Sequence, residues 1–138
     1  MNLIITLDDN GGMTFNGRRQ SRDKALLADI ARDVSASHLP LLATHFSEKL
    51  LAEADIPCEI FADAAERAAN GQYCLLENTE LSPFIERAER LIVYRWNRKY
   101  PCDRKIDIDI DLLFALESSC DFVGNAHEKI TKTVYVKR

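Results

Sequence analysis

The sequence has few of the residues from which metal, redox and membrane sites are built. Its 138 residues include four cysteines and three histidines. The cysteines are widely spaced without a C-x-x-C pair, so the chain signals neither a zinc site nor a redox dithiol. No apolar run approaches the roughly 20 residues of a membrane span. Positive charge is not in excess either, and the net charge of −4 disfavours tight nonspecific nucleic-acid binding unless a local basic patch offsets it.

What the chain does have is enough apolar material for one core. Hydrophobic residues make up 46% of it, which at this length predicts a single domain over residues 1–138. The first apolar run ends at Asp8 and is too short for the hydrophobic part of a secretion signal. We therefore expect a cytoplasmic protein without a membrane partner, whose cysteines are reduced and mostly buried in strands.

Strand and helix patterns alternate through the first two thirds of the chain. Residues 2–7 have the composition of a buried strand and lead into a turn-rich segment with Gly11 and Gly12. Residues 22–35 carry apolar side chains at helical spacing. The pattern then predicts strands at 39–43, 57–61, 72–76 and 91–96, and helices at 47–54, 62–69 and 82–89. Such alternation favours a largely parallel sheet with helices on both faces.

The last third has a different pattern. Ile106, Ile108 and Ile110 alternate with aspartates, the period of a strand with one face in water. Residues 114–122 and 129–136 both have extended character and flank a predicted turn at Gly124, so we expect a closing antiparallel hairpin. The predicted fold class is α/β, a three-layer domain with a mostly parallel central sheet, flanking helices and a C-terminal antiparallel hairpin.

This order of elements, taken with certain residues, resembles dihydrofolate reductase. Residues 3–8 read LIITLD, similar to the first strand of that family, x-L-I-x-A-x-D, and a glycine-containing loop with Asn16-Gly17 follows. Residues 121–127 read DFVGNAH, similar to the D-F-x-G-x-x-H of the family's closing hairpin. The resemblance implies the fold, and it places Asp23 where the family has the acidic residue that holds the pterin.

Three positions depart from the motifs of that family. Arg19-Gln20 stands where the family usually has Pro-Trp, and Thr44 to Ser47 keeps T-x-x-S without the preceding Gly-Arg. Glu77-Asn78 replaces a glycine pair that lets backbone N–H groups approach the dinucleotide pyrophosphate. Because a pyrophosphate needs close backbone approach and positive potential, we expect ordinary NADPH binding to be lost. We expect no metal cofactor.

The candidate site is the cleft between the 11–22 loop and the ends of the central strands. Asp23 is its candidate catalytic acid; the favoured alternative is a structural acid that pairs with Arg22 or the helix dipole. The candidate ligand-binding residues are Leu7, Gly12, Arg18, Arg19, Thr44, Ser47, Glu77, Asn78 and Arg95.

Three further features of the sequence are weaker indications of function. Residues 127–131 begin like H-E-x-x-H, but Thr131 stands where the second histidine is required. Asp107, Asp109 and Asp111 have the spacing of the first ligands of a calcium loop, but Leu112 occupies the glycine position. A basic surface beside aromatic side chains would suit a nucleotide or stacked bases; its candidate members are Arg18, Arg19, Arg22, Arg95, Arg98, Lys99, Arg104 and Lys105, beside Trp96 and Tyr100.

Three functions follow as hypotheses. The leading one is a repurposed domain that binds a small molecule or a protein partner in this cleft. The second is a reductase acting on a pterin-like substrate with an unusually bound NADPH. The third is an RNA-binding or nucleolytic protein, although the H-x-H-x-D-H motif of ribonuclease Z is absent. Nucleic-acid binding and the oligomeric state stay open at this point.

Overall fold

The computed structural model describes residues 1–138 and is built on a seven-stranded sheet with the order β5-β4-β6-β1-β7-β10-β9. The parallel part consists of β1 (Asn2–Leu7), β4 (Leu41–Ala43), β5 (Cys58–Ile60), β6 (Tyr73–Leu75) and β7 (Arg90–Arg95). The C-terminal hairpin of β9 (Phe114–Phe122) and β10 (Ile130–Lys137) joins it antiparallel to β7. The predicted fold class, including the closing hairpin, is therefore confirmed.

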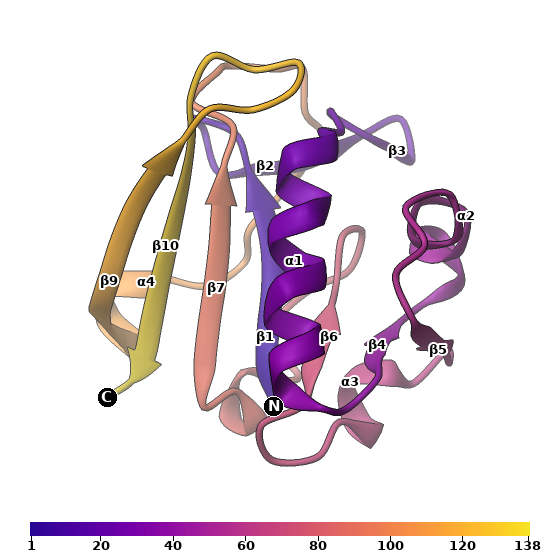
Figure 1. The fold of residues 1–138 in the computed structure, drawn as a ribbon. Coiled ribbons are helices and arrows are strands. Elements are labelled where there is room, and N and C mark those ends of the chain that lie inside the picture. The colour runs from indigo at the N-terminus through magenta and orange to yellow at the C-terminus, as the bar shows by residue number, and fades with distance from the viewer.

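Helices cover both faces of this sheet (Figure 1). On one face, α1 (Lys24–Ser37) and α2 (His45–Glu53) pack on a core that includes Ile4 and Ile92. On the other face, α3 (Ala64–Arg67), the 3₁₀ turn η1 (Ile85–Arg87) and α4 (Ile110–Leu113) surround a second core. Leu3 and Ile5 point into this second core because side chains alternate along a strand.

The first helix shows how the sequence sets its own boundaries. Leu26, Leu27, Ile30 and Val34 recur at helical spacing and are all buried against the sheet. Asp23 precedes the helix with extended backbone, and its side chain accepts hydrogen bonds from the first free N–H groups. His38 ends the helix in the left-handed conformation (φ 59°).

The segment predicted to be a loop after β1 forms a second, smaller sheet. It consists of β2 (Gly12–Phe15), β3 (Arg18–Arg19) and β8 (Arg104–Lys105), in the order β3-β2-β8. Asn16 and Gly17 form the turn between β2 and β3 with φ values of 51° and 67°. Two consecutive residues with positive φ are typical of the tight turns that close β-hairpins.

Two predicted elements are wrong. Residues 82–89 form only the short turn η1, and the N–H groups of Leu81 and Ser82 before it donate to the Asp107 carboxylate. The predicted strand at 106–110 is an irregular segment that leads into α4, where the Asp109 side chain accepts from the Leu112 N–H. The alternating isoleucines do pack against the core. Asp107 instead binds the distant N–H groups of Leu81 and Ser82, and Asp109 binds a local N–H group, which is the usual competition of such side chains with regular structure.

The cysteines only partly follow the prediction. All four are unpaired and three lie in strands, but Cys74 alone is buried, while Cys120 on the edge strand β9 is exposed. None of the helices combines the length and the apolar composition needed to cross a bilayer.

Candidate functional site

Four segments meet at the carboxyl end of the parallel strands. Figure 1 shows the β2–β3 hairpin, the first turn of α1 and the β9–β10 loop at this end of the molecule, above the end of β1. In open α/β sheets, ligands bind outside the carboxyl ends of the strands. The predicted cleft therefore lies where a site is expected for this architecture.

Asp23 is at the centre of this region, and its carboxylate is saturated with hydrogen bonds. It accepts five: from the N–H groups of Ala25 (2.8 Å) and Leu26 (3.3 Å), from those of Asn125 (2.9 Å) and Ala126 (2.8 Å), and from Nδ1 of His127 (2.8 Å). The side chain is completely buried. Asp23 thus holds the β9–β10 loop against the start of α1.

Its environment fixes the protonation state of Asp23. Burial by itself raises the pKa of this carboxyl, but the hydrogen bonds from Asn125, His127 and Ala126 outweigh that effect and leave the pKa far below its usual range. The group is an ionised acceptor rather than a proton donor. Its contacts favour the structural alternative, with His127 and backbone N–H groups as partners in place of the predicted Arg22, which pairs with Glu53.

The close approach of the loop to Asp23 requires a glycine. A Cβ added at Gly124 would lie 2.7 Å from Oδ2 of Asp23 and 2.8 Å from the carbonyl oxygen of His127, well inside normal contact distance. The sequence therefore has Gly124 at this position because any side chain would separate the loop from the helix.

His127 is a functional candidate that was not among the predicted site residues. Its Nε2 lies 2.9 Å from Oγ of Ser21 and 3.1 Å from the hydroxyl of Tyr100. Its ring stacks on Trp96 at 4.6 Å between centroids. The only signal of this site in the sequence was the D-F-x-G-x-x-H resemblance, which gave the position of the histidine without its partners.

Three of the predicted ligand-binding residues contact one another. Nε of Arg19 lies 2.6 Å from Oε1 of Glu77, and Nη2 lies 2.7 Å from Oε2. Oγ of Ser47 donates to the same carboxylate. The Arg19 guanidinium also lies over the ring of Phe46, 5.1 Å from its centroid. A fork of this kind, with Glu77 buried and Arg19 mostly so, is a strong and directional pairing.

This pairing closes the cleft. The remaining cavity between β1, α1 and the end of β6, whose wall includes Arg19, Glu77 and Asp23, has a volume of about 20 Å³. Cavities that hold small ligands have volumes of roughly 300–1,000 Å³. In this conformation the cleft has room for no ligand larger than a water molecule.

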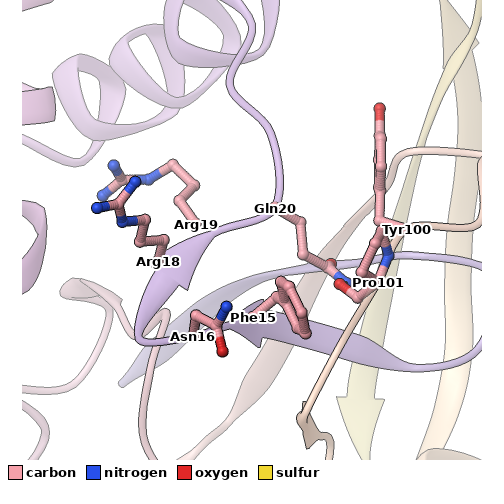
Figure 2. A pocket seen from close by; sticks show the side chains of 7 residues that line it. All are labelled: Phe15, Asn16, Arg18, Arg19, Gln20, Tyr100 and Pro101. Atoms are coloured by element: carbon pink, nitrogen blue, oxygen red, sulfur yellow. The ribbon is translucent and has the colours of Figure 1, made fainter.

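Arg18, next in sequence to Arg19, is exposed and lines an open pocket of about 570 Å³. Figure 2 shows Arg18 and Arg19 on one side of this pocket, Gln20, Tyr100 and Pro101 on the other, and Phe15 and Asn16 below them. The Arg18 guanidinium has no ionic or hydrogen-bonding partner within the chain, in contrast to Arg19.

The other predicted ligand-binding residues do not lie together in one place. Leu7 is part of the second core, and the Gly12 N–H donates to Asp8 at 2.7 Å, with Gln20 and Cys102 packed against its Cα. Thr44 is the residue before α2 and makes no side-chain cap, and Asn78 is half-buried beside the open pocket that contains Arg104 and Lys105.

The predicted basic surface is not continuous. Arg95 lies on the opposite face of the sheet from Trp96, donates to the hydroxyl of Tyr135 and shares a pocket with Asp107 and Asp109. Trp96 is buried against His127, and the Tyr100 hydroxyl also contacts His127. Trp96 therefore has no free face beside the predicted arginines. No group of three or more His, Cys, Asp or Glu side chains is arranged to hold a metal ion.

Comparison with known proteins identifies the architecture. No protein-family model and no curated protein sequence matches the chain. Among solved structures, it is similar to dihydrofolate reductase from Enterococcus faecalis complexed with NADP(H) and RAB-propyl, with a TM-score of 0.70 over 99% of this chain and 95% of that one. The two sequences are 10% identical. The chain therefore has the dihydrofolate reductase fold, and the similarity concerns the fold alone.

Proposed function

We propose that this chain is a repurposed binding protein on the dihydrofolate reductase fold, which takes a small anionic ligand at the pocket beside Arg18 and does not use NADPH. The observation that carries the proposal is the pairing of Arg19 with Glu77. It occupies the cleft of the fold and leaves Arg18 as the free cation at the adjacent opening.

The residues present do not fit a dinucleotide cofactor. The pyrophosphate would have to approach the backbone after β6, where the buried Glu77 carboxylate is held by Arg19 and Ser47. The Arg19–Glu77 pair carries no net positive charge, whereas phosphate binding depends on free N–H groups and positive potential. The Arg19 guanidinium, which could otherwise attract a phosphate, is already paired with Glu77.

The contacts of Asp23 also favour a binding protein over a pterin reductase. A carboxyl group that delivers a proton or orients a pterin needs a free oxygen and a pKa near the working pH. The Asp23 carboxylate has five partners within the chain and a pKa far below its usual range, because its hydrogen bonds outweigh the effect of burial.

The pocket beside Arg18 has the chemistry for a flat anion. Arg18 supplies a guanidinium, which matches a carboxylate or phosphate with two parallel donors. Asn16 supplies an amide, and Phe15, 41% exposed, supplies an apolar aromatic surface. An aromatic carboxylate or an aryl phosphate would contact all three groups.

The test is a thermal-stability screen with benzoate, salicylate and phenyl phosphate at millimolar concentration. A ligand that reaches 100 times its Kd stabilises the folded state by about 2.7 kcal/mol, which is a rise in Tm of several degrees at this size. We expect at least one of these probes to raise the Tm of the unmodified protein and of Arg32→Ala, but not that of Arg18→Ala. Arg32 is the matched control because it is an exposed arginine on α1 whose partner is Asp29. Equal shifts in all three proteins, or no shift with any probe, would overturn the proposal.

A further inference from the structure

Ser21, His127 and Asp23 form a continuous chain of hydrogen bonds. Oγ of Ser21 lies 2.9 Å from Nε2 of His127, and Nδ1 of the same ring lies 2.8 Å from Oδ2 of Asp23. A hydroxyl, an imidazole that contacts it and a carboxylate that orients the imidazole are the three parts of an activated serine nucleophile. Such an arrangement is recognised by geometry and not by position in the sequence.

The contacts of Asp23 determine which nitrogen of His127 carries the proton. The carboxylate accepts from four backbone N–H groups and is ionised, so it acts as the acceptor for Nδ1–H. In the tautomer that carries its one proton on Nδ1, the lone pair is on Nε2, which lies 2.9 Å from Oγ of Ser21. This is the tautomer in which a histidine takes a proton from a serine.

The ring of His127 is held in this orientation. It stacks on the buried indole of Trp96, and its side chain is only 3% exposed. The neighbouring Gly124 N–H donates to the carbonyl oxygen of His127 at 2.9 Å, which fixes the backbone of the loop. A base that is locked by packing on one side and by a carboxylate on the other is preorganised for proton transfer.

A second hydroxyl, that of Tyr100, lies 3.1 Å from the same nitrogen. A neutral Nε2 has one lone pair and accepts fully from one hydroxyl at a time. Ser21 is the closer of the two, and its aliphatic oxygen is the stronger nucleophile once its proton has been removed. Tyr100 thus provides an internal control, because it touches the base without being suited to attack.

Ser21 is half-buried on the wall of the closed cleft. The residue before it, Gln20, lines the open pocket together with Tyr100. The backbone N–H groups of Ser21, Arg22 and Asp23 donate to no acceptor within the chain.

We propose that Ser21 is the nucleophile of an acyl-transfer site that hydrolyses small esters, with His127 as general base and Asp23 as the residue that positions it. Oγ of Ser21 bonds to the carbonyl carbon while its proton moves to Nε2 of His127. Collapse of the intermediate breaks the ester C–O bond, and Nε2 returns the proton to the departing alcohol. Water then repeats the sequence on the acyl-serine, so that ester and water give acid and alcohol. The Arg18 pocket need not bind a ligand for this site to operate.

The test is covalent labelling of the folded protein with a fluorophosphonate, located by mass spectrometry of its peptides, together with p-nitrophenyl acetate hydrolysis. We expect one label, on Ser21, and loss of label and hydrolysis by at least 100-fold in Ser21→Ala and in His127→Gln. Ser82→Ala removes an exposed serine outside the site and is the matched control, which should keep both the label and the hydrolysis. Tyr100→Phe removes the other hydroxyl from Nε2, so it should keep the label on Ser21 while its rate of hydrolysis changes.

The structural alternative, in which these hydrogen bonds only fix the loop, predicts a different result. It predicts no label, or equal weak labelling at several serines, and it predicts that Ser21→Ala and Tyr100→Phe behave alike. Either result overturns the proposal. Circular dichroism shows whether each variant is folded, and if Ser21→Ala does not fold, the position of the label in the unmodified protein decides.

Discussion

The Asp23 carboxylate joins the start of α1 to the β9–β10 loop, two segments about a hundred positions apart in the sequence. Oδ1 accepts hydrogen bonds from the N–H groups of Ala25 and Asn125, one in each segment. Oδ2 accepts from the N–H group of Ala126 and from the ring of His127. Because all these partners donate to an anion, the contacts exist in full only while Asp23 is ionised. This single residue therefore couples the charge state of the protein to the geometry of the Ser21–His127 pair.

A pH dependence follows from this coupling. The folded-state pKa of Asp23 is lowered, because its hydrogen bonds outweigh burial, so it contributes stability above the unfolded value of about 3.9 and loses it as the pH falls further. We expect the free energy of unfolding, measured by urea denaturation, to be at its full value above about pH 5 and to decline below about pH 4.

Asp23→Asn tests the assignment of that decline. It should lower the free energy of unfolding at pH 7 by roughly 3 kcal/mol, since buried donors lose an anionic partner. It should also make the decline of that free energy at low pH less steep. Part of the slope will remain: although burial raises the pKa values of Asp8 and Asp107, backbone hydrogen bonds leave them lowered as well. Asp9 is exposed and lies just after β1, so Asp9→Asn is the control and should change neither the stability at pH 7 nor its decline at low pH. An unchanged decline in Asp23→Asn would contradict this account.

At the scale of elements, Arg19 connects the β2–β3 hairpin to the other side of the cleft. Arg19 pairs with Glu77, which follows β6. In α2, Phe46 lies under the Arg19 guanidinium and Ser47 donates to Glu77. One arginine thus connects the small sheet to the large sheet and to a helix. The hairpin turn at Asn16 and Gly17 places it there, and the positive φ values at both residues make that turn tight.

A double-mutant cycle of Arg19→Met and Glu77→Gln measures this connection. Arg19→Met should destabilise by roughly 3 kcal/mol, because it leaves a buried carboxylate unpaired, whereas the double variant should lose less than the sum of the single changes. We expect a coupling energy of about 2 kcal/mol, the range for close and mostly buried charge pairs. Urea unfolding of the four proteins gives the value, and strictly additive losses would show that the pair does not hold the cleft closed.

The sequence predicts the elements of the large sheet because each carries its own periodicity. The apolar spacing of α1 and the extended character of the two segments around the turn at Gly124 are local signals. The small sheet has no such signal, since β3 and β8 are two residues long and exist only through pairing with β2. Residues 106–110 have the period of a strand, yet Asp107 and Asp109, although exposed, bind backbone N–H groups outside any strand pairing.

The candidate site could be predicted only in part for a similar reason. The resemblance gathered Arg19, Ser47 and Glu77 in one predicted site, but sequence position does not reveal that they bind one another. Ser21 and His127 lie 106 positions apart, and no short motif contains both. Long-range pairs of this kind follow from the topology, after the helix start and the hairpin loop have been brought to the same end of the sheet.

At the scale of the whole molecule, the dihydrofolate reductase fold is retained while its cleft is closed. The chain matches nearly the full length of an NADP(H)-bound reductase structure at 10% identity. A fold is compatible with many functions, because function depends on the residues of the site. Here those residues give a closed cleft of about 20 Å³, a free arginine at its edge and a serine–histidine–aspartate chain behind it.

The most direct measurement of the central claim is calorimetric titration of NADPH into the purified protein at neutral pH and physiological salt. We predict no saturable heat up to millimolar NADPH, because Glu77, with its partners Arg19 and Ser47, stands where the resemblance to dihydrofolate reductase implies a glycine that approaches the pyrophosphate. A reductase of this fold, titrated in parallel, confirms that the cofactor is competent to bind. Saturable binding of NADPH with a Kd in the micromolar range would contradict the account and would support the reductase hypothesis instead.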